Sequence, residues 1–530
     1  MDTQESDLTT RMYVCGPTVY DDSHLGHART YMTVDILMRI MNSIANTKTH
    51  LVMNITDIDD KIIKKAADTN SNGWSDIAKQ YEKSFFESMA KLNVKLPDTI
   101  IRVSDVMPQI ILYIQKIIDN GFAYVTSDSS VYFDTNEYIR HGYEFDNTID
   151  DDERAYHSTL SPALRLQKRN KKDFALWKGR LASEVGFNAE FVCNEEKITS
   201  WGRPGWHIEC SAMIHETIGP NLDIHFGGID LKFPHHYNER LQAHAYYHPK
   251  FIPTSNHEET TTDSSIATAP YSPWPSTIST EIASATDSYV ATAPYSPWSS
   301  KFHHVGHLCI KGLKMSKSLK NFTTIDEALK EINANQMRWM FMIHKWTDQM
   351  DFSDDTVTQA KVFDNIVSNF LNRIVNYPFD RLHSKYNDKE FVLADYFHQS
   401  KSKIISELMA FKLDTASLVF FDLIGKTNSY TGMTDPNACL VRKIYDWVLQ
   451  LVTILGFEYQ KSSDGSTGAD IMNVLISTRS ELRKMTRDPN FTKEIKQKIF
   501  QILDTERNIL LPSIGITLQD TKDSSSWFKN

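Results

Sequence analysis

The N-terminal third of the chain alternates strand-like and helix-like segments, and this order restricts the fold more than any other feature. RMYVCG (11–16) and LVMNIT (51–56) are short apolar runs of the kind that form buried strands. Between them, HLGHARTYMTVDILMRIMNSI (24–44) carries apolar residues every three or four positions, as one face of a helix does. Two strands joined through a helix favour a parallel sheet, so we predict an α/β core.

The last third of the chain shows a different pattern, because apolar residues recur at helical spacing almost throughout after residue 353. Ser353 is of the residue type that caps a helix N-terminus. Further helices are predicted over 394–425, 438–455 and 489–511. We therefore predict a helical bundle appended to the α/β core.

Residues 255–300 differ in composition from the rest of the chain, since Ser, Thr, Ala and Pro dominate there. The octapeptide ATAPYSPW occurs at 267–274 and again at 291–298. One repetition cannot build a solenoid, which needs about three units. With few apolar residues to bury, this segment is predicted to be a solvated, disordered insertion.

Length and composition exclude several classes of protein. The chain has 530 residues, of which 41% are hydrophobic and 23% charged, so it can bury a sizeable core and is not fibrous. No apolar run approaches the roughly 20 residues of a membrane-spanning helix, and the polar start MDTQESDLTT does not resemble a signal or transit peptide. The net charge of −10 argues against unspecific coating of nucleic acid.

Five cysteines lie scattered along the chain, at positions 15, 193, 210, 309 and 439. An odd number at irregular spacing argues against a disulfide framework. We therefore expect a reducing, cytoplasmic setting, with neither a membrane nor DNA as a partner.

Two short motifs carry the residues best suited to chemistry, HLGH (24–27) at a strand-to-helix turn and KMSKS (314–318) much later in the chain. A helix N-terminus with free N–H groups, a glycine and histidine donors suits phosphate binding. A lysine-rich loop can neutralise a leaving pyrophosphate. Either motif alone could be a surface feature, either two exposed histidines or a charged turn. Together they predict a nucleotide site in which His24, Gly26, His27 and Lys317 bind ATP and Lys314 is a further cation on the loop that closes on the pyrophosphate.

The pair HLGH and KMSKS resembles the signature motifs of class I aminoacyl-tRNA synthetases. Between them stand MYVCGPTVY, NITDIDDKI, GRPGWHIECSAM, DIHFGG and FPHHYNE, a series similar to the cysteinyl-tRNA synthetase family. RNILLPSIGITLQD and SSSWFK near the end also resemble that family, so the resemblance covers nearly the whole chain. It implies a Rossmann-like, nucleotide-binding catalytic core with a parallel sheet, an inserted connective subdomain and a C-terminal helical bundle.

The resemblance also implies a division into domains. The catalytic domain would comprise a first half over 1–100 and a second half with the KMSKS loop over 196–352, separated by a connective insertion over 101–195. A helical region that binds tRNA and its anticodon would occupy 353–530.

Cys15, Cys210, His235 and Glu239 offer ligands for a metal ion from widely separated positions. Their spacing alone leaves two interpretations open, a zinc site or buried free cysteines beside a capping histidine. The resemblance implies that these four residues hold one Zn²⁺, which would select the thiolate of the substrate. The neighbouring His236 is expected to point elsewhere on its helix.

The activity implied by the resemblance has two steps, formation of cysteinyl-adenylate and pyrophosphate from L-cysteine and ATP, and transfer of the cysteinyl group to cysteine tRNA. Mg²⁺ would accompany ATP. The implied catalytic residues are His24, His27, Lys314 and Lys317, and the implied residues of the amino-acid pocket are Trp206 and His207.

Two other functions remain open at this point. The chain could be a cysteine ligase that uses the same catalytic core to join cysteine to a small amine. The long helical tail over 353–530 counts against this function, because such ligases lack a full anticodon-reading end. A catalytically silent, synthetase-derived RNA-binding protein would not need intact HLGH, KMSKS and metal-ligand positions.

Overall fold

The computed structural model describes residues 9–69, 71, 73–146, 167–247, 298, 301–310, 312–314, 322–375, 386–433, 435–459, 466–487, 491–511, 516–520 and 525–529. The predicted insertion at 255–300 lies outside the described residues, apart from Trp298. Contacts divide the chain into two units, Met1–Glu458 and Tyr459–Asn530.

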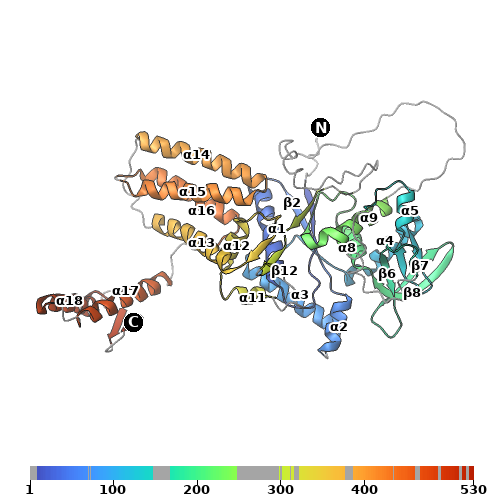
Figure 1. Ribbon diagram of the computed structural model, residues 1–530, viewed down its shortest axis with the longest axis horizontal. Coiled ribbons are helices and arrows are strands. Elements are labelled where there is room, and N and C mark those ends of the chain that lie inside the picture. Colours follow the sequence, from blue (N-terminus) through green and yellow to red (C-terminus); the bar gives the residue numbers. More distant parts are fainter. Residues whose placement is uncertain are drawn as a thin grey trace, which may run out of the picture. The chain divides into compact units, whose positions relative to one another are not determined.

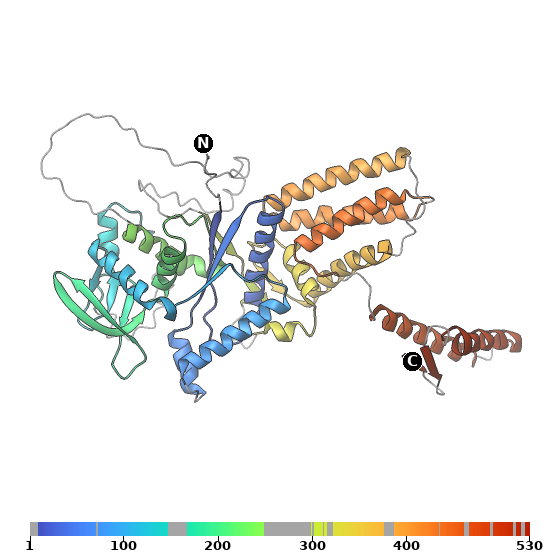
Figure 2. The ribbon, with the colours of Figure 1, turned by 180° about the vertical axis from the view of Figure 1, so that it is seen from behind.

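The first unit is built on a five-stranded parallel sheet, as the N-terminal pattern predicts (Figures 1 and 2). The strand order is β10-β9-β1-β2-β3. These strands are β1 (Thr10–Val14), β2 (Thr49–Ile55), β3 (Thr99–Arg102), β9 (Ile224–Gly228) and β10 (Phe302–Val305). Helix α1 (Leu25–Ser43) connects β1 to β2, and α2 (Asp60–Asp68) and α3 (Trp74–Lys91) connect β2 to β3. The order reverses between β1 and β9, and open α/β sheets bind ligands at such a point, beyond the carboxyl ends of the strands.

A second, antiparallel sheet lies between β3 and β9 in the sequence, with the order β4-β5-β6-β8-β7. Its strands are β4 (Ala123–Val125), β5 (Val131–Phe133), β6 (Ala175–Gly179), β7 (Phe187–Cys193) and β8 (Glu196–Pro204). The helical segments around it are η1 (Ser104–Val106), α4 (Met107–Asp119), α5 (Thr135–Arg140) and α8 (Trp206–Thr217). Helix α8 leads from β8 back to the amino end of β9, where the insertion rejoins the parallel sheet.

The chain after β10 forms a small sheet and then helices. β11 (Leu308–Ile310) pairs with β12 (Leu313–Lys314) and β13 (Met350–Phe352), and α11 (Ile325–Ala328) and α12 (Ala334–Met342) lie between them in the sequence. The helices that follow are α13 (Asp354–Val375), α14 (Asp388–Met409), α15 (Leu413–Thr431) and α16 (Ala438–Ile454). These helices and the inserted antiparallel sheet lie on opposite sides of the parallel sheet (Figure 1).

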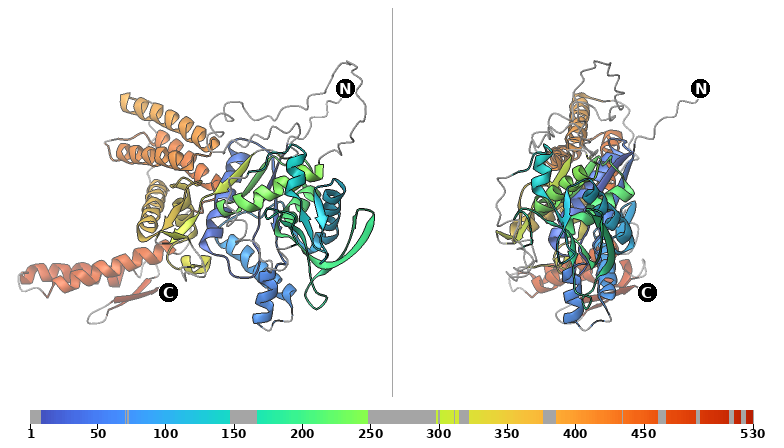
Figure 3. Two further views of the ribbon diagram at one scale, coloured as in Figure 1. Left: turned by 45° about the vertical axis from the view of Figure 1, so that its right-hand side comes forward. Right: turned by 90° about the vertical axis from the view of Figure 1, so that its right-hand side faces the viewer.

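The single helix predicted over 394–425 is wrong, because two helices occupy this stretch, α14 and α15, which lie side by side (Figures 1 and 3). Phe411 adopts a left-handed backbone conformation with φ 57°. The Lys412 N–H then donates to the Glu407 carbonyl at 2.9 Å, which is the bond that closes a helix C-terminus. Glycine usually occupies this position, so the sequence gives no warning of the turn.

A buried ionic cluster joins α1 to the helices that follow the small sheet. Asp35 on α1 accepts hydrogen bonds from Arg39 Nε at 2.8 Å and from Arg338 Nη1 on α12 at 2.6 Å. The side chains of Asp35 and Arg338 are 2% and 1% exposed. Arg338 also donates to the carbonyl of Leu455, directly after α16, at 3.1 Å. The cluster therefore connects three elements of the first unit through one carboxylate.

We expect Asp35→Ala to lower the free energy of unfolding by roughly 3–5 kcal/mol, because it leaves two buried guanidinium groups without their carboxylate. Asp446→Ala is the matched control, since Asp446 also pairs with an arginine four residues away but is 54% exposed. That control should cost about 0.5 kcal/mol or less. Denaturant unfolding of both variants measures the difference, and equal costs would contradict the assigned role of the cluster.

The second unit contains α17 (Ser466–Met485), α18 (Lys493–Thr505), η4 (Glu506–Leu510) and a hairpin of β14 (Ile516–Asp520) and β15 (Ser525–Lys529). Leu511 and Leu518 are buried and pack with Leu475 and Ile476. Among the described residues of both units, no helix combines the length and the apolar content that a bilayer crossing requires.

Candidate active site and metal centre

Cys15 and Gly16 form the end of β1, beside the point where the strand order reverses. The Cys15 N–H donates to the carbonyl of Phe226 in β9 at 3.2 Å, and the Gly16 N–H donates to Asn54 Oδ1 at 2.8 Å. A Cβ on residue 16 would lie 1.6 Å from the carbonyl oxygen of Asn54, so only glycine fits there. The tight contact places Cys15 directly between the ends of β2 and β9.

The HLGH motif forms the N-terminus of α1, where His24 is the capping residue. The His27 N–H donates to His24 Nδ1 and the His24 N–H donates to His27 Nδ1, each at 3.3 Å. The two rings stack with their centroids 3.8 Å apart. Because each Nδ1 accepts, a neutral ring carries its proton on Nε2, and both rings therefore present an N–H donor at the start of the helix. A Cβ on Gly26 would lie 2.8 Å from His24 Cε1, so glycine permits this arrangement.

The residues that follow KMSKS contact the HLGH turn. The Leu25 N–H donates to the Thr323 carbonyl at 3.1 Å, and the Ile325 N–H donates to the Ser23 carbonyl at 3.0 Å. The ring of Phe322 stands edge-on to that of His24, with centroids 5.2 Å apart. Lys314 ends β12, whereas residues 315–321, including the predicted Lys317, lie outside the described residues. The structure thus brings HLGH and the C-terminal flank of KMSKS together.

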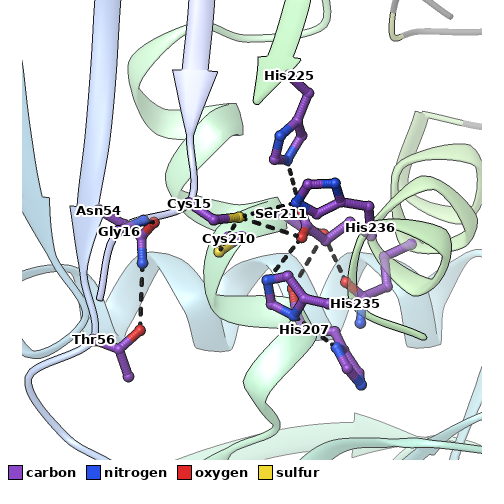
Figure 4. A network of polar contacts seen from close by, with 12 residues as sticks. Cys15, Gly16, Asn54, Thr56, His207, Cys210, Ser211, His225, His235 and His236 are labelled. Atoms are coloured by element: carbon purple, nitrogen blue, oxygen red, sulfur yellow. Dashed lines mark hydrogen bonds and ion pairs between the residues drawn. The ribbon is translucent and has the colours of Figure 1, made fainter. Parts of the chain in front are cut away.

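The four predicted metal ligands meet in one buried cluster. Figure 4 labels three of them, Cys15, Cys210 and His235. Cys15 Sγ lies 3.9 Å from Cys210 Sγ and 4.0 Å from Glu239 Oε1, and His235 Nε2 lies 2.9 Å from the same carboxylate oxygen. Cys210 comes from α8, His235 from η3 (Lys232–His236) and Glu239 from α9 (Tyr237–Tyr247). Two thiols, one imidazole and one carboxylate with all donor atoms within 4.8 Å of one another fit a zinc-type ion.

The electrostatics of this cluster also favour a cation. Burial raises the pKa of Cys210, but the hydrogen bond from Cys15 and the charge of His235 lower it to about 6. Burial also raises the pKa of Glu239, yet the nearby His235 and His225 hold it well below its usual value. A thiolate and a carboxylate are therefore stabilised in a site closed to water, where a bound cation would neutralise them.

Trp206 and His207, predicted to line the amino-acid pocket, lie against His235. The ring of Trp206 stacks on that of His235 with centroids 4.3 Å apart. His207 Nδ1 lies 2.9 Å from His235 Nδ1, which leaves Nε2 of His235 directed at the cluster. Both residues at the start of α8 therefore position one predicted ligand.

The expectation that His236 points elsewhere on its helix is wrong. Its Nε2 lies 3.3 Å from Cys15 Sγ, within the cluster (Figure 4). Residues 232–236 form a π-helical turn with an extended residue, Phe233, instead of a regular α-helix, so the angle between successive side chains differs from the expected one. Both histidines of the pair consequently face the cluster.

The prediction also omitted His225, whose Nε2 lies 2.9 Å from Glu239 Oε2. A signal for it exists in the sequence. His225 sits in the DIHFGG segment, and its strand pairs in parallel with β10, which carries His304 in KFHHVGH. His225 pairs with Phe302, and His304 lies two residues farther along β10 on the same face of the sheet, so a histidine cluster could have been inferred from the two segments.

Comparison with known proteins defines the class of this fold and site. The family model for the catalytic domain of class I (C) tRNA synthetases matches residues 3–262 and 284–362, and its unmatched gap falls inside the predicted insertion. Among solved structures, methionyl-tRNA synthetase of Mycobacterium tuberculosis in complex with methionyl-adenylate superposes with a TM-score of 0.52 at 12% identity, over 84% of this chain and 90% of that one. The agnB2 LeuRS of Agrobacterium radiobacter K84, in a ternary complex with tRNA and LeuAMS, gives a TM-score of 0.53 at 9% identity, over 86% of this chain and 84% of that one. At such identities the likeness shows the fold, which is that of a class I tRNA synthetase.

Sequence comparison with curated relatives identifies the family within this class. A cysteine–tRNA ligase of Acanthamoeba polyphaga mimivirus is 50% identical over 98% of this chain and 96% of that protein. The cytoplasmic cysteine–tRNA ligase of Dictyostelium discoideum is 34% identical over 98% of this chain and 73% of its own length, and that of Methanococcus maripaludis is 32% identical over 98% and 94%. The chain belongs to the cysteine–tRNA ligase family.

Proposed function

We propose that this chain ligates L-cysteine to cysteine tRNA in two steps. Cysteine and ATP form cysteinyl-adenylate with release of pyrophosphate, and the cysteinyl group then passes to the terminal ribose of the tRNA with release of AMP. The observation that carries the proposal is the contact between the HLGH turn and the flank of KMSKS, on a helix whose Tyr31 hydroxyl donates to the carbonyl of Cys15 in the buried Cys/His/Glu cluster. Membership of the cysteine–tRNA ligase family supports it.

The N-terminus of α1 is the proposed site of the ATP phosphates. His24 and His27 hold each other through their Nδ1 atoms, so their Nε2 donors are fixed before the nucleotide binds. Such preorganised donors can stabilise charge that develops on the α-phosphate during attack by the cysteine carboxylate. Gly26 keeps the backbone accessible, and Lys314 and Lys317 would neutralise the departing pyrophosphate together with Mg²⁺.

The buried cluster is the proposed zinc site, held by Cys15, Cys210, His235 and Glu239. When bound, zinc supplies a soft Lewis acid that prefers a thiolate over a hydroxyl ligand. Trp206 stacks on His235 and would form one wall of the amino-acid pocket, while His207 orients the His235 ring. A site that binds the cysteine thiolate directly rejects serine far more strongly than an apolar pocket could, because serine lacks the group that the site binds. No separate editing step is therefore needed against serine.

The proposal also gives a function to the parts of the chain outside the parallel sheet. The inserted segment 101–195 would connect the two catalytic halves, and the helical region 353–530 would bind tRNA and its anticodon. None of the five cysteines, all of them described in the structure, is in a disulfide, and two of them belong to the proposed zinc site, so a reducing compartment such as the cytoplasm suits the protein.

Cysteine-dependent ATP–pyrophosphate exchange, followed by charging of cysteine tRNA, tests the proposal. We expect exchange with cysteine and a much lower rate with serine at equal concentration. Exchange without charging would favour a ligase that acts on a small amine. Absence of exchange from a folded, zinc-loaded protein would favour a silent RNA-binding relative, and either outcome would overturn the proposal.

A further inference from the structure

A second set of four ligand atoms overlaps the proposed zinc site. Cys15, His225, His236 and Glu239 are all buried and also present their donor atoms within 4.8 Å of one another. Cys15 Sγ lies 3.3 Å from His236 Nε2, and Glu239 Oε2 lies 2.9 Å from His225 Nε2. The two sets share Cys15 and Glu239, whereas Cys210 and His235 belong to the first set alone.

Glu239 lies between the two sets and directs one carboxylate oxygen toward each. Oε1 lies 2.9 Å from His235 Nε2, in the first set, and Oε2 lies 2.9 Å from His225 Nε2, in the second. One carboxylate therefore faces a different imidazole on each side. A metal ion could bind on either side without rotation of the Glu239 side chain.

The second set also has the outer hydrogen bond that orients metal-binding histidines in proteins. His236 Nδ1 lies 2.9 Å from His304 Nε2 on β10, just as His235 Nδ1 lies 2.9 Å from His207 Nδ1. When Nδ1–H donates to the neighbouring ring, the lone pair of Nε2 is directed at Cys15. A divalent ion bound by the second set would replace the two short contacts, of His236 with Cys15 and of His225 with Glu239, by bonds to the metal.

We propose that Cys15, His225, His236 and Glu239 form a second metal position, which takes a zinc-class divalent ion as an alternative to the first position. Glu239 has a separate oxygen for each set, but both sets need the one sulfur atom of Cys15, so a full set of four terminal ligands forms at one position at a time. With one thiolate instead of two, the second position binds zinc more weakly than the first. It therefore fills when the first set is incomplete. The proposal concerns metal binding alone and does not depend on the reaction catalysed.

Removal of Cys210 tests the proposal, because Cys210 belongs only to the first set. The full-length variants Cys210→Ala, Cys210→Ala with His236→Gln, and Cys210→Ala with His303→Gln are dialysed against chelator-buffered zinc and their metal content is measured by elemental analysis. His303 is the matched control, since it is a buried histidine beside His304 and belongs to neither set. Cobalt(II) replaces zinc in parallel samples, and its thiolate charge-transfer absorption reports how many thiolates bind.

We expect Cys210→Ala to hold one zinc ion per chain, with a charge-transfer band of about half the wild-type intensity because one thiolate remains. Adding His236→Gln should raise the dissociation constant by a further factor of about 10–100 or more, since a ligand is lost. Adding His303→Gln should leave the constant within a few-fold of Cys210→Ala. His236→Gln alone should keep its zinc, because the first position is intact.

Equal zinc affinity of Cys210→Ala with and without His236→Gln would overturn the proposal, because the ion would then remain at the first position with water in place of the thiolate. Loss of zinc from a folded Cys210→Ala protein would overturn it as well. Circular dichroism and the melting temperature establish folding, and Cys210→Ser, which preserves the side-chain volume, replaces the alanine variant if that variant does not fold. None of these outcomes bears on the cysteine-dependent exchange of the wild-type chain.

Discussion

Replacement of His27 by asparagine is expected to slow cysteine-dependent ATP–pyrophosphate exchange by about 10²- to 10³-fold. The asparagine Oδ1 occupies the place of His27 Nδ1 and can still accept the hydrogen bond from the His24 N–H, so the cap of α1 is preserved. The Nε2 donor is lost, however, and with it one fixed donor for the charge that develops on the transferring phosphate. The loss should appear in kcat, while the melting temperature changes little.

The control for this variant is His50→Asn. His50 lies at the amino end of β2, away from the carboxyl edge of the sheet, and its Nε2 lies 3.1 Å from Thr99 Oγ1. The substitution removes a half-buried histidine outside the proposed ATP site and should leave exchange unchanged. A His27→Asn protein that exchanges at the wild-type rate would remove His27 from the catalytic set. A large drop in its melting temperature would show instead that its part in the cap dominates.

Cys15→Ala is expected to weaken zinc binding and cysteine activation together. Cys15 belongs to both sets of ligands, so its loss leaves each position with only three protein donors. We expect the zinc dissociation constant to rise by roughly 10²-fold or more. Exchange with cysteine should fall by a comparable factor, whereas ATP binding at the N-terminus of α1 should persist, since other residues form that site.

Cys309→Ala provides the matched control for Cys15→Ala. Cys309 on β11 is not in a disulfide and is 2% exposed, so the same atoms are removed from a similarly buried place outside the cluster. This variant should keep its zinc and its exchange activity. Elemental analysis beside exchange assays on the same preparations measures both effects, and zinc retained by folded Cys15→Ala would contradict the ligand assignment.

Periodicity in the sequence is enough to predict the parallel sheet and the helical C-terminal part, because both depend on long, regular patterns of apolar residues. The break between α14 and α15 escaped prediction, since Phe411 adopts a backbone conformation that usually requires glycine. The Phe411 carbonyl accepts a hydrogen bond from Trp346 Nε1 at 2.9 Å, a contact between residues 65 positions apart. Tertiary contacts of this kind leave no local pattern in a sequence.

Only part of the candidate site could be predicted, again because contacts between distant residues leave no local pattern in a sequence. The spacing of Cys15, Cys210, His235 and Glu239 does not itself define a metal site, and the resemblance to a family directed attention to them. The structure brings the four together, but it also brings in His225 and His236. The direction of His236 depends on the irregular turn before α9, which the FPHHYNE segment does not reveal.

Helix α1 fixes the direction of the HLGH histidines relative to the buried ionic cluster around Asp35. Its 19 residues carry the HLGH turn at one end and Asp35 and Arg39 farther along, where Arg338 fastens the helix. In an α-helix each residue turns the backbone by about 100°, so one residue gained or lost between Gly26 and Asp35 would rotate the histidine pair away from the sheet edge while Asp35 stayed in place. An insertion or deletion of one residue in this part of α1 would therefore misdirect the proposed phosphate-binding histidines even if the helix still formed and Asp35 kept its partners.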